Sequence, residues 1–318
     1  MIVAQPNREM YGRTLVELGE QDARIVVLEA DIAKSTNTFQ FQRRFPERFF
    51  EIGVAEMNMV CMAAGLAATG FVPFASTFCV FASMRACEGI RTSIAYPKLN
   101  VKIVATNAGV EIAGDGATHQ GIEDLAIMRA IPNLTVLSPS DPVTTRRAVL
   151  AMARTEGPFY MRLGRQAAKV LHAEETPFEV GRMIRLREGR DVTLIATGNM
   201  VEQALTAAEI LSSLKVEARV LDCHTIKPID VAAIVAAARE TGAIVTAEDH
   251  NIVGGLGGAV CEVVAEHAPT IVRRVGVADV FPGSGRDYRR LLEHYDLDAA
   301  NIVLSAREAL HSCHAVVS

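Results

Sequence analysis

Apolar runs and helical patterns alternate along the first half of the chain. The apolar runs have the length of buried strands and lie at 24–30, 71–75, 101–106, 134–139 and 158–163. Segments with helical patterns lie between them, at 56–69, 80–95, 122–129 and 142–154. Strands that alternate with helices indicate βαβ units, and therefore a parallel sheet with helices on both faces.

A charged segment that contains glycine and proline, 166–190, interrupts this alternation. We interpret it as a linker with room for one strand. A second series follows, with strands predicted at 191–198, 217–222, 243–249 and 271–277, and helices at 201–214, 231–241 and after the glycines of 254–258. The sequence therefore predicts an α/β protein with two doubly wound domains, over 1–165 and 191–318.

Composition narrows the class of protein. The chain has 318 residues, half of them hydrophobic, and a formal net charge of −5. This charge, with no run of Lys or Arg, argues against a nucleic-acid-binding surface. None of the six cysteines forms a C-x-x-C pair, and the first residues lack the basic and apolar regions of a signal peptide. We expect reduced thiols in a cytoplasmic protein.

The span 57–84 carries no charged residue. A membrane helix is a poor interpretation, because Asn58, Gly65, Gly70 and Pro73 interrupt the apolar positions. The pattern favours a helix, a turn and a strand that are buried on every side. Such burial also suits a subunit interface.

Glu56 is a lone acid immediately before this uncharged span. One interpretation is an acid in the first turn of a helix, where the helix dipole favours it. The other is a carboxyl that Ile52, Val54 and Met57 keep away from water. Such a carboxyl favours its protonated form and can share that proton with a ligand nitrogen.

Other motifs also allow two interpretations. Phe78 and Phe81 are three residues apart, which suits either core packing or a stacking surface for a flat heterocycle. The glycines of 254–258 resemble a phosphate loop but lack its Lys-Ser/Thr, so tight packing at a helix start is favoured. His224 and His250 are expected to be polar loop residues. Asp115 and His119 lie in a turn after a buried strand, where α/β sheets bind ligands.

Five sequence stretches together resemble the C-terminal portion of transketolase. They are "RFFEIGVAEMNM", "PFASTFCVFASMRA", "SIAYPKLNVKIV", "DGATHQGIEDLAIMRAIPNLTVLSPSD" and "GPFYMRLGR", in this order. The resemblance covers the whole chain. It implies a domain that binds the pyrimidine ring of thiamine diphosphate, followed by a transketolase C-terminal domain.

The resemblance also implies a partner chain. In the family, Asp of a Gly-Asp-Gly motif and an Asn about 25–30 residues later hold the Mg²⁺ of the diphosphate. Here Asn133 follows Asp115 too closely, so we reject this motif as a metal site. The resemblance therefore implies the C-terminal subunit of a split transketolase. Mg²⁺ or Ca²⁺ would be held by an N-terminal subunit in a two-plus-two assembly.

Roles for individual residues follow from the resemblance alone. It implies that Glu56 bonds the pyrimidine nitrogen and thereby favours the imino tautomer that removes the C2 proton of the thiazolium. It implies that Phe81, with Phe78 beside it, stacks on the pyrimidine, and that Asp31 lies near the thiazolium. Asp115 and His119 would contact the hydroxyls of the donor ketose, His119 also in catalysis. The groups implied for the sugar phosphate are Arg8, Ser35, Arg165 and the residue at position 107.

The chain departs from the family at three positions. Asn107 stands where the family usually has His, and Met57 and Met84 also replace more polar residues. The change at Asn107 affects the sugar-phosphate end, so the usual donor is in doubt. Two alternatives stay open. One is a beta-type subunit of a deoxyxylulose-phosphate synthase or a 2-oxoacid dehydrogenase, and the other is a non-catalytic scaffold. A scaffold has no need of Glu56, Phe81, Asp115 and His119 together.

Overall fold

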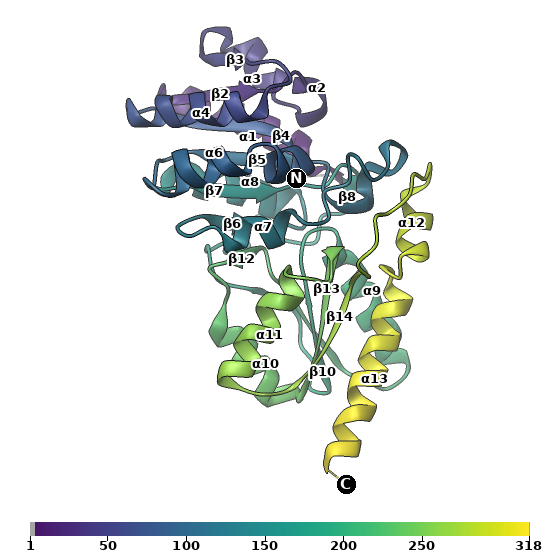
Figure 1. Cartoon of the computed structure of the whole chain (residues 1–318). Helices are drawn as coiled ribbons and strands as arrows, with labels where there is room; N and C mark the ends of the chain where they lie inside the picture. Colours follow the sequence, from purple (N-terminus) through teal and green to yellow (C-terminus); the bar gives the residue numbers. More distant parts are fainter. Residues whose placement is uncertain (1–3, 318) are drawn as a thin grey trace.

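The computed structural model describes the backbone of residues 4–317 and side chains up to residue 312. It has two stacked α/β units, called layers below, and each layer consists of one sheet with the helices that cover it (Figure 1). The first sheet has seven strands in the order β12-β6-β7-β5-β4-β2-β3, all parallel except β12. The strands are β2 (Ile25–Glu29), β3 (Phe49–Glu51), β4 (Val72–Phe78), β5 (Lys102–Thr106), β6 (Thr135–Leu137), β7 (Phe159–Arg162) and β12 (Thr225–Lys227).

Helices cover both faces of the first sheet, as the sequence predicts. One face packs against α1 (Asn7–Gln21), α3 (Phe39–Arg44) and α8 (Pro142–Arg154). The other packs against α4 (Glu56–Ala68), α5 (Cys79–Met84) and α7 (Asp124–Ala130). The central strands β2, β4, β5 and β7 are buried along their length because side chains leave both of their faces for a core, whereas the edge strand β3 is buried only at Phe49. A short helix α2 (Ala33–Thr36) follows β2.

The second sheet has five strands in the order β14-β13-β10-β11-β9. They are β9 (Ile184–Arg187), β10 (Val192–Ala196), β11 (Ala218–Asp222), β13 (Ala243–Asn251) and β14 (Ile271–Val277). Only the edge strand β9 is antiparallel. The helices are α9 (Met200–Ser213), α10 (Val231–Thr241), α11 (Leu256–His267), α12 (Tyr288–His294) and α13 (Ala299–Val317).

The two layers share one hydrophobic core, so the predicted α/β fold is confirmed but its halves are not separate. Met59 and Leu125 of the first layer belong to the same buried cluster as Ile195, Ile244 and Leu256 of the second. In addition, β12 comes from the second half of the sequence but pairs with β6 at the edge of the first sheet. The two layers are therefore packed against each other, and the domain bounds stay a prediction.

The segment 166–190 contains two short strands rather than one. β8 (Ala167–Ala168) pairs with β1 (Gln5–Pro6), and β9 completes the second sheet. His172 in this segment is buried, with its ring nitrogens each 3.2 Å from a carboxylate oxygen, of Asp141 on one side and Asp222 on the other. These are ion-pair contacts rather than aligned hydrogen bonds. They connect the segment to both layers.

The prediction of one helix over 80–95 is wrong. The segment folds as α5, a short α6 (Cys87–Gly89) and a π-helical turn, Ile90–Ala95. Arg85 is the residue that follows α5, and its backbone N–H still bonds back to Phe81. The break places Arg85 beside the start of α4 instead of along a continuous helix.

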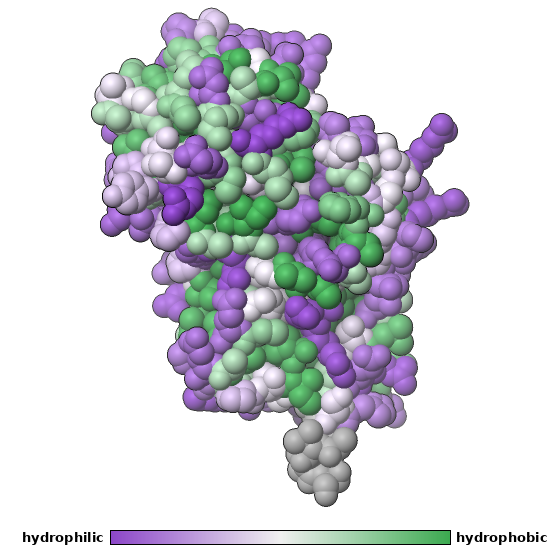
Figure 2. Space-filling view, in the orientation of Figure 1, coloured by the Kyte–Doolittle hydropathy of each residue, from purple (hydrophilic) through white to green (hydrophobic). Residues whose placement is uncertain are grey.

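The expectation that α4 is buried on every side is also wrong for this chain. Met59, Val60, Ala63 and Ala64 are buried, but Met57 and Met62 are 36% and 40% exposed, and Cys61 is exposed too. Figure 2 shows apolar residues on the side of the molecule that carries α4. No helix of the described residues 4–317 is long and apolar enough to cross a membrane.

Candidate functional site

Glu56 is the first residue of α4 and has a buried side chain, 4% exposed. Its neighbour is Arg85, whose Nη1 donates a hydrogen bond of 3.3 Å to Glu56 Oε1. Arg85 is itself 54% exposed. The carboxyl therefore lies at the floor of a surface depression lined by Ala55, Met57, Asn58, Cys61 and Arg85. The acid predicted from the sequence is thus within reach of a ligand.

Aromatic side chains connect this depression to the turn after β5. The rings of Phe78 and Phe81 are stacked with centroids 5.9 Å apart, and His119 lies edge-on to Phe81 at 5.3 Å. The Cζ atom of Arg85 lies 4.2 Å from the centroid of Phe81. Glu56, Arg85, Phe81 and His119 thus form a continuous series of contacts, although they come from three separate segments.

Two cationic side chains, Arg8 and Arg165, lie near the loop that carries His119, where Arg165 contacts Asp115. Arg8 is the second residue of α1, and its Nη1 donates to the carbonyl of Ser35 at 2.6 Å. Burial lowers the pKa of Arg8, and the charge of Arg165 lowers it further, so the two guanidinium groups are close. Arg165 Nη1 also lies 3.6 Å from Asp115 Oδ2. Arg8 Nε is buried without a partner, which leaves an N–H for an anion.

Asn107 and Asp31 both have a left-handed backbone conformation, with φ of 61° and 62°. Asn tolerates this region better than most residues. Asn107 is buried and its Oδ1 accepts no hydrogen bond from the described residues. Asp31 is exposed and lines a hollow with Ser35 and Glu51, whose Oε1 accepts from the Asp31 backbone N–H at 2.7 Å. No direct contact joins Asp31 to Glu56 or Phe81 among the described residues.

The loop that carries Asp115 and His119 is held by the second layer. Asp249 of β13 accepts a 2.9 Å hydrogen bond from the backbone N–H of Val110. Gln120 Nε2 donates to the carbonyl of Gly283, and the N–H of Gly285 donates to the carbonyl of Ala113. The C-terminal layer therefore fixes both ends of the loop, although its own residues were not predicted to take part in the site.

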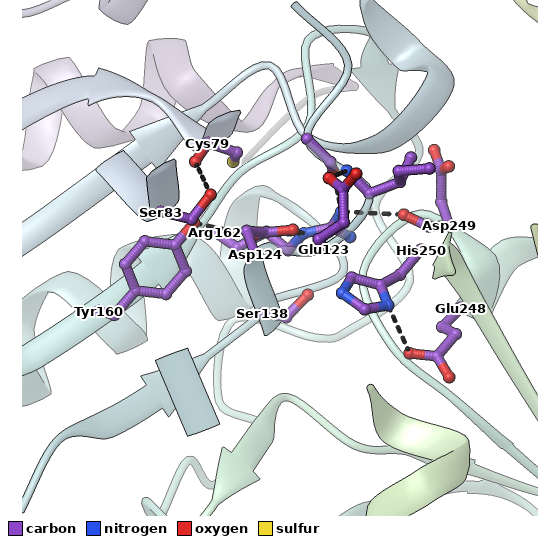
Figure 3. A network of polar contacts seen from close by, with 12 residues as sticks. Cys79, Ser83, Glu123, Asp124, Ser138, Tyr160, Arg162, Glu248, Asp249 and His250 are labelled. Carbon is purple, nitrogen blue, oxygen red and sulfur yellow. Dashed lines mark hydrogen bonds and ion pairs between the residues drawn. The ribbon is translucent and has the colours of Figure 1, made fainter. Parts of the chain in front are cut away.

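A buried ion pair lies under this loop (Figure 3). Arg162 at the end of β7 bonds the carboxylate of Asp124 through Nε, at 3.0 Å to Oδ2, while its Nη2 donates to the carbonyls of Gly121 and Asp249. Tyr160 donates a further hydrogen bond to Asp124, at 2.8 Å. Both charges are almost without solvent contact. The pair connects the two layers at the base of the candidate site.

Glu111 is a second buried acid next to Arg165. Its Oε2 accepts from the backbone N–H of Gln166 at 2.9 Å, and Gln166 Nε2 donates to the Glu111 carbonyl. Burial, and then the charge of Asp249, raise the pKa of Glu111 to about 7. Glu111 therefore fixes the backbone beside Arg165 and titrates near neutral pH.

The glycines of 254–258 pack tightly at a helix start, as predicted. The carboxylate of Glu248 accepts the N–H groups of Leu256 and Gly257 at 2.7 and 2.8 Å. A Cβ on Gly255 would lie 2.0 Å from Glu248 Oε2. The carboxylate of Glu248 thus accepts the backbone N–H groups that a bound phosphate would otherwise use.

The expectation of polar loop histidines is wrong for His250, which is buried on β13. His224 does lie in a loop, between β11 and β12, but it is buried, with its ring stacked on Phe178 at 4.1 Å. Both belong to the packing between the layers, because strand ends are interior wherever two sheets meet.

Similarity to known proteins agrees with this geometry. The family model of the transketolase pyrimidine binding domain matches residues 4–170, and that of the transketolase C-terminal domain matches residues 181–302. The chain therefore belongs to the transketolase family and spans its pyrimidine-binding and C-terminal domains.

Individual relatives cover nearly the whole chain. Subunit SqwH of 6-deoxy-6-sulfo-D-fructose transketolase from Clostridium sp. (strain MSTE9) is 43% identical over 95% of this chain and 93% of its own length. A subunit of apulose-4-phosphate transketolase from Phocaeicola vulgatus is 36% identical over 95% and 96%. A solved structure described as "Split gene transketolase, inactive beta4 tetramer" is 49% identical, covers 97% and 99% of the two chains, and has a TM-score of 0.89.

The residues present fit the pyrimidine half of thiamine diphosphate, the cofactor that the family implies. A buried carboxyl and an aromatic ring already hold a flat cation, the guanidinium of Arg85, and an aminopyrimidine offers the same combination of a flat ring and N–H donors. Within residues 4–317, no group of three or more His, Cys, Asp or Glu side chains could hold a metal ion.

Proposed function

We propose that this chain is the subunit of a split, thiamine-diphosphate-dependent transketolase that binds the pyrimidine ring of the cofactor and most of the donor sugar. The reaction is transfer of a two-carbon ketol unit from a ketose to an aldose. The observation that carries this proposal is the buried carboxyl of Glu56 beside Phe81 and His119, at the ligand-binding end of a parallel sheet. Family membership supports it.

Glu56 holds the proton that its carboxyl shares with the pyrimidine ring nitrogen. Burial suits this task, because little water competes with the ring nitrogen for the carboxyl. Phe81 and Phe78 supply the aromatic surface that orients the ring. When bound, thiamine diphosphate supplies the nucleophilic carbon that accepts and releases the ketol unit. We assign cofactor contact near the thiazolium to Asp31.

His119 and Asp115 orient the hydroxyls of the donor. Both lie on the loop fixed by Asp249, so their positions are set before the sugar binds. His119 Nδ1 is 2.9 Å from the hydroxyl of Thr118, which limits rotation of the imidazole ring. The Nε2 edge is then available to a substrate hydroxyl or a transferred proton.

Arg8 and Arg165, with Ser35 and Asn107, bind an anionic end of the donor. The unpartnered Nε of Arg8 is the atom that supports the anion site, whereas the unpartnered Oδ1 of Asn107 can accept a hydrogen bond from a hydroxyl of the donor. A phosphate or a sulfonate meets the same guanidinium groups. The names of two relatives, one for a sulfo-fructose and one for apulose 4-phosphate, support a donor other than the commonest pentulose phosphate.

We further propose that activity requires an N-terminal partner subunit, in a two-plus-two assembly, which supplies Mg²⁺ or Ca²⁺ and the diphosphate site. The solved structure that is 49% identical is described as an inactive tetramer of beta chains, which supports this requirement. The isolated chain should bind thiamine diphosphate weakly and turn over no substrate.

The test is to purify the chain with its partner and to measure ketol transfer to ribose 5-phosphate. The donors compared are xylulose 5-phosphate, fructose 6-phosphate, 6-deoxy-6-sulfofructose and apulose 4-phosphate. We expect transfer that depends on both chains and on added cofactor. Tight cofactor binding by the isolated chain, or no transfer from any ketose by the complex, would contradict the proposal.

A further inference from the structure

Arg85 contacts both groups of the proposed pyrimidine site at once, the carboxyl of Glu56 and the ring of Phe81. Its guanidinium donates to Glu56 at 3.3 Å and lies over the ring of Phe81, with Cζ 4.2 Å from the centroid. A second flat ring cannot share the covered face of Phe81. Arg85 and Glu56 also line the same surface depression, so the guanidinium stands where a ligand of the carboxyl would enter.

A guanidinium is a close chemical substitute for an aminopyrimidine. Both are flat, both present N–H donors to a carboxyl, and both bind to the face of an aromatic ring. The arrangement with Arg85 therefore excludes the cofactor by its position, because the guanidinium is bonded to the Glu56 carboxyl and covers the ring of Phe81.

The side chain of Arg85 is free to leave. It is 54% exposed, and among the described residues its only polar side-chain contact is Glu56. It follows α5 at the break in the 80–95 segment, where Met84 is also exposed, so little packing holds the side chain in place. Exposed ion pairs and exposed cation–π contacts are each weak, so a ligand with more contacts displaces the arginine.

We infer that Arg85 is an internal competitor for the pyrimidine ring, which fills the site of the unliganded subunit and is displaced when the cofactor binds. This inference rests on the proposed function, because it takes Glu56 and Phe81 to be the pyrimidine site. It assigns to Arg85 a role in setting cofactor affinity. Glu56 is thereby kept from water and from unrelated cations until the cofactor arrives.

Two binding measurements test this role. Calorimetry on the complex with its partner chain gives the Kd for thiamine diphosphate, and ligand-observed NMR on the isolated chain gives the Kd for 4-amino-5-hydroxymethyl-2-methylpyrimidine, the pyrimidine half of the cofactor. Because Arg85→Ala removes a weak competitor, we expect both Kd values to fall by about three- to tenfold in this variant. Arg85→Lys keeps the charge but loses the flat group, so its Kd values should lie between those of the wild type and of Arg85→Ala. Arg91→Ala, an exposed arginine of the following turn, is the control and should change neither.

The outcomes separate this inference from the proposed function. If Arg85→Ala leaves both Kd values unchanged or weakens them, Arg85 is no competitor, even if the complex is active and loses activity in Glu56→Gln. If neither the wild type nor Arg85→Ala binds the pyrimidine, and the complex does not bind the cofactor, both proposals fail. Tightening in Arg85→Ala but not in Arg91→Ala supports the role assigned to Arg85.

Discussion

The two ends of the candidate site are built differently. The Glu56 end lies at a surface, and its carboxyl has one charged neighbour, the exposed side chain of Arg85. The His119 end rests on buried groups of the other layer, among them Asp249, and on the pair of Arg162 with Asp124. On the proposed function, the sugar end is supported within this chain and the cofactor end is left open. A cofactor shared with a partner subunit would require this arrangement.

Arg162→Met tests the buried end of this comparison and should have the largest effect on stability. It leaves Asp124 charged, buried and without its ion-pair partner, and breaking such a pair costs roughly 3–5 kcal/mol. The measurement is urea unfolding of the isolated chain. Arg165→Met, three residues further on and half-exposed, is the matched control. It should change stability by less than about 1 kcal/mol but raise the donor KM.

Glu56→Gln tests the open end. The amide keeps the shape of the side chain but cannot share a proton as a carboxyl does, so turnover should fall by about 10²- to 10⁴-fold. Unfolding of the isolated chain should change little. The assay is ketol transfer by the complex, with Glu88→Gln, an exposed acid of α6, as control. Near-normal turnover would show that Glu56 has no part in cofactor activation.

His172 makes the connection between the layers depend on pH. Although burial alone would lower it, contact with the carboxylates of Asp141 and Asp222 raises the pKa of His172 to about 9, from 6.5. A group whose pKa is raised on folding contributes its full stabilisation at pH values below its pKa in the unfolded chain. Stability is therefore gained below about pH 6.5 and lost as pH rises through about 9, on the order of 3 kcal/mol in total.

The check is the difference in unfolding free energy between the wild type and His172→Gln, followed from pH 6 to pH 10. Taking the difference removes groups that titrate in both proteins, such as Lys102, whose pKa burial lowers to about 7. Burial lowers the pKa of the neighbouring imidazole of His224. A difference that stays constant with pH would show that His172 is not charged in the folded protein.

Asn107→His should have the smallest effect, and on specificity rather than stability. His adds a donor that is cationic when protonated, and it tolerates the positive φ at this position. We expect the ratio of kcat/KM for xylulose 5-phosphate to that for a sulfonate or branched donor to rise by about tenfold, roughly the loss or gain of one charged hydrogen bond. If the wild type already prefers xylulose 5-phosphate and the variant gains nothing, position 107 does not select the donor.

Much of the fold could be predicted from the sequence, because each buried parallel strand corresponds to a short run of apolar residues. Strands β2, β4, β5 and β13 lie within or close to the predicted ranges, and β14 has the predicted bounds. The strands that were missed are short or lie at an edge, such as β3, β9 and β12. Their pairing depends on segments far away in the sequence, and local pattern carries no information about that.

The residues of the candidate site likewise differ in whether the sequence around them gives a signal. Glu56, Phe81 and His119 were found because the sequence stretches around them resemble the family, and Glu56 also because it precedes an uncharged span. Arg85 was visible in the sequence only as the charge that ends the uncharged span after Glu56. Its contact with Glu56 depends on the break after α5, which a helical pattern over 80–95 conceals. Asp249 is brought to the site by the packing of the second layer, so no local signal marks it.

The pairing of β12 with β6 has a consequence for synthesis of the chain. The first sheet cannot be closed at this edge until residues 225–227 have left the ribosome, long after β7 has been made. Until then β6 presents unpaired backbone groups, which favour association with other chains. Fragments that end near residue 180 should therefore aggregate or exchange strands, and the two halves should be recovered in good yield only when they are made as one polypeptide.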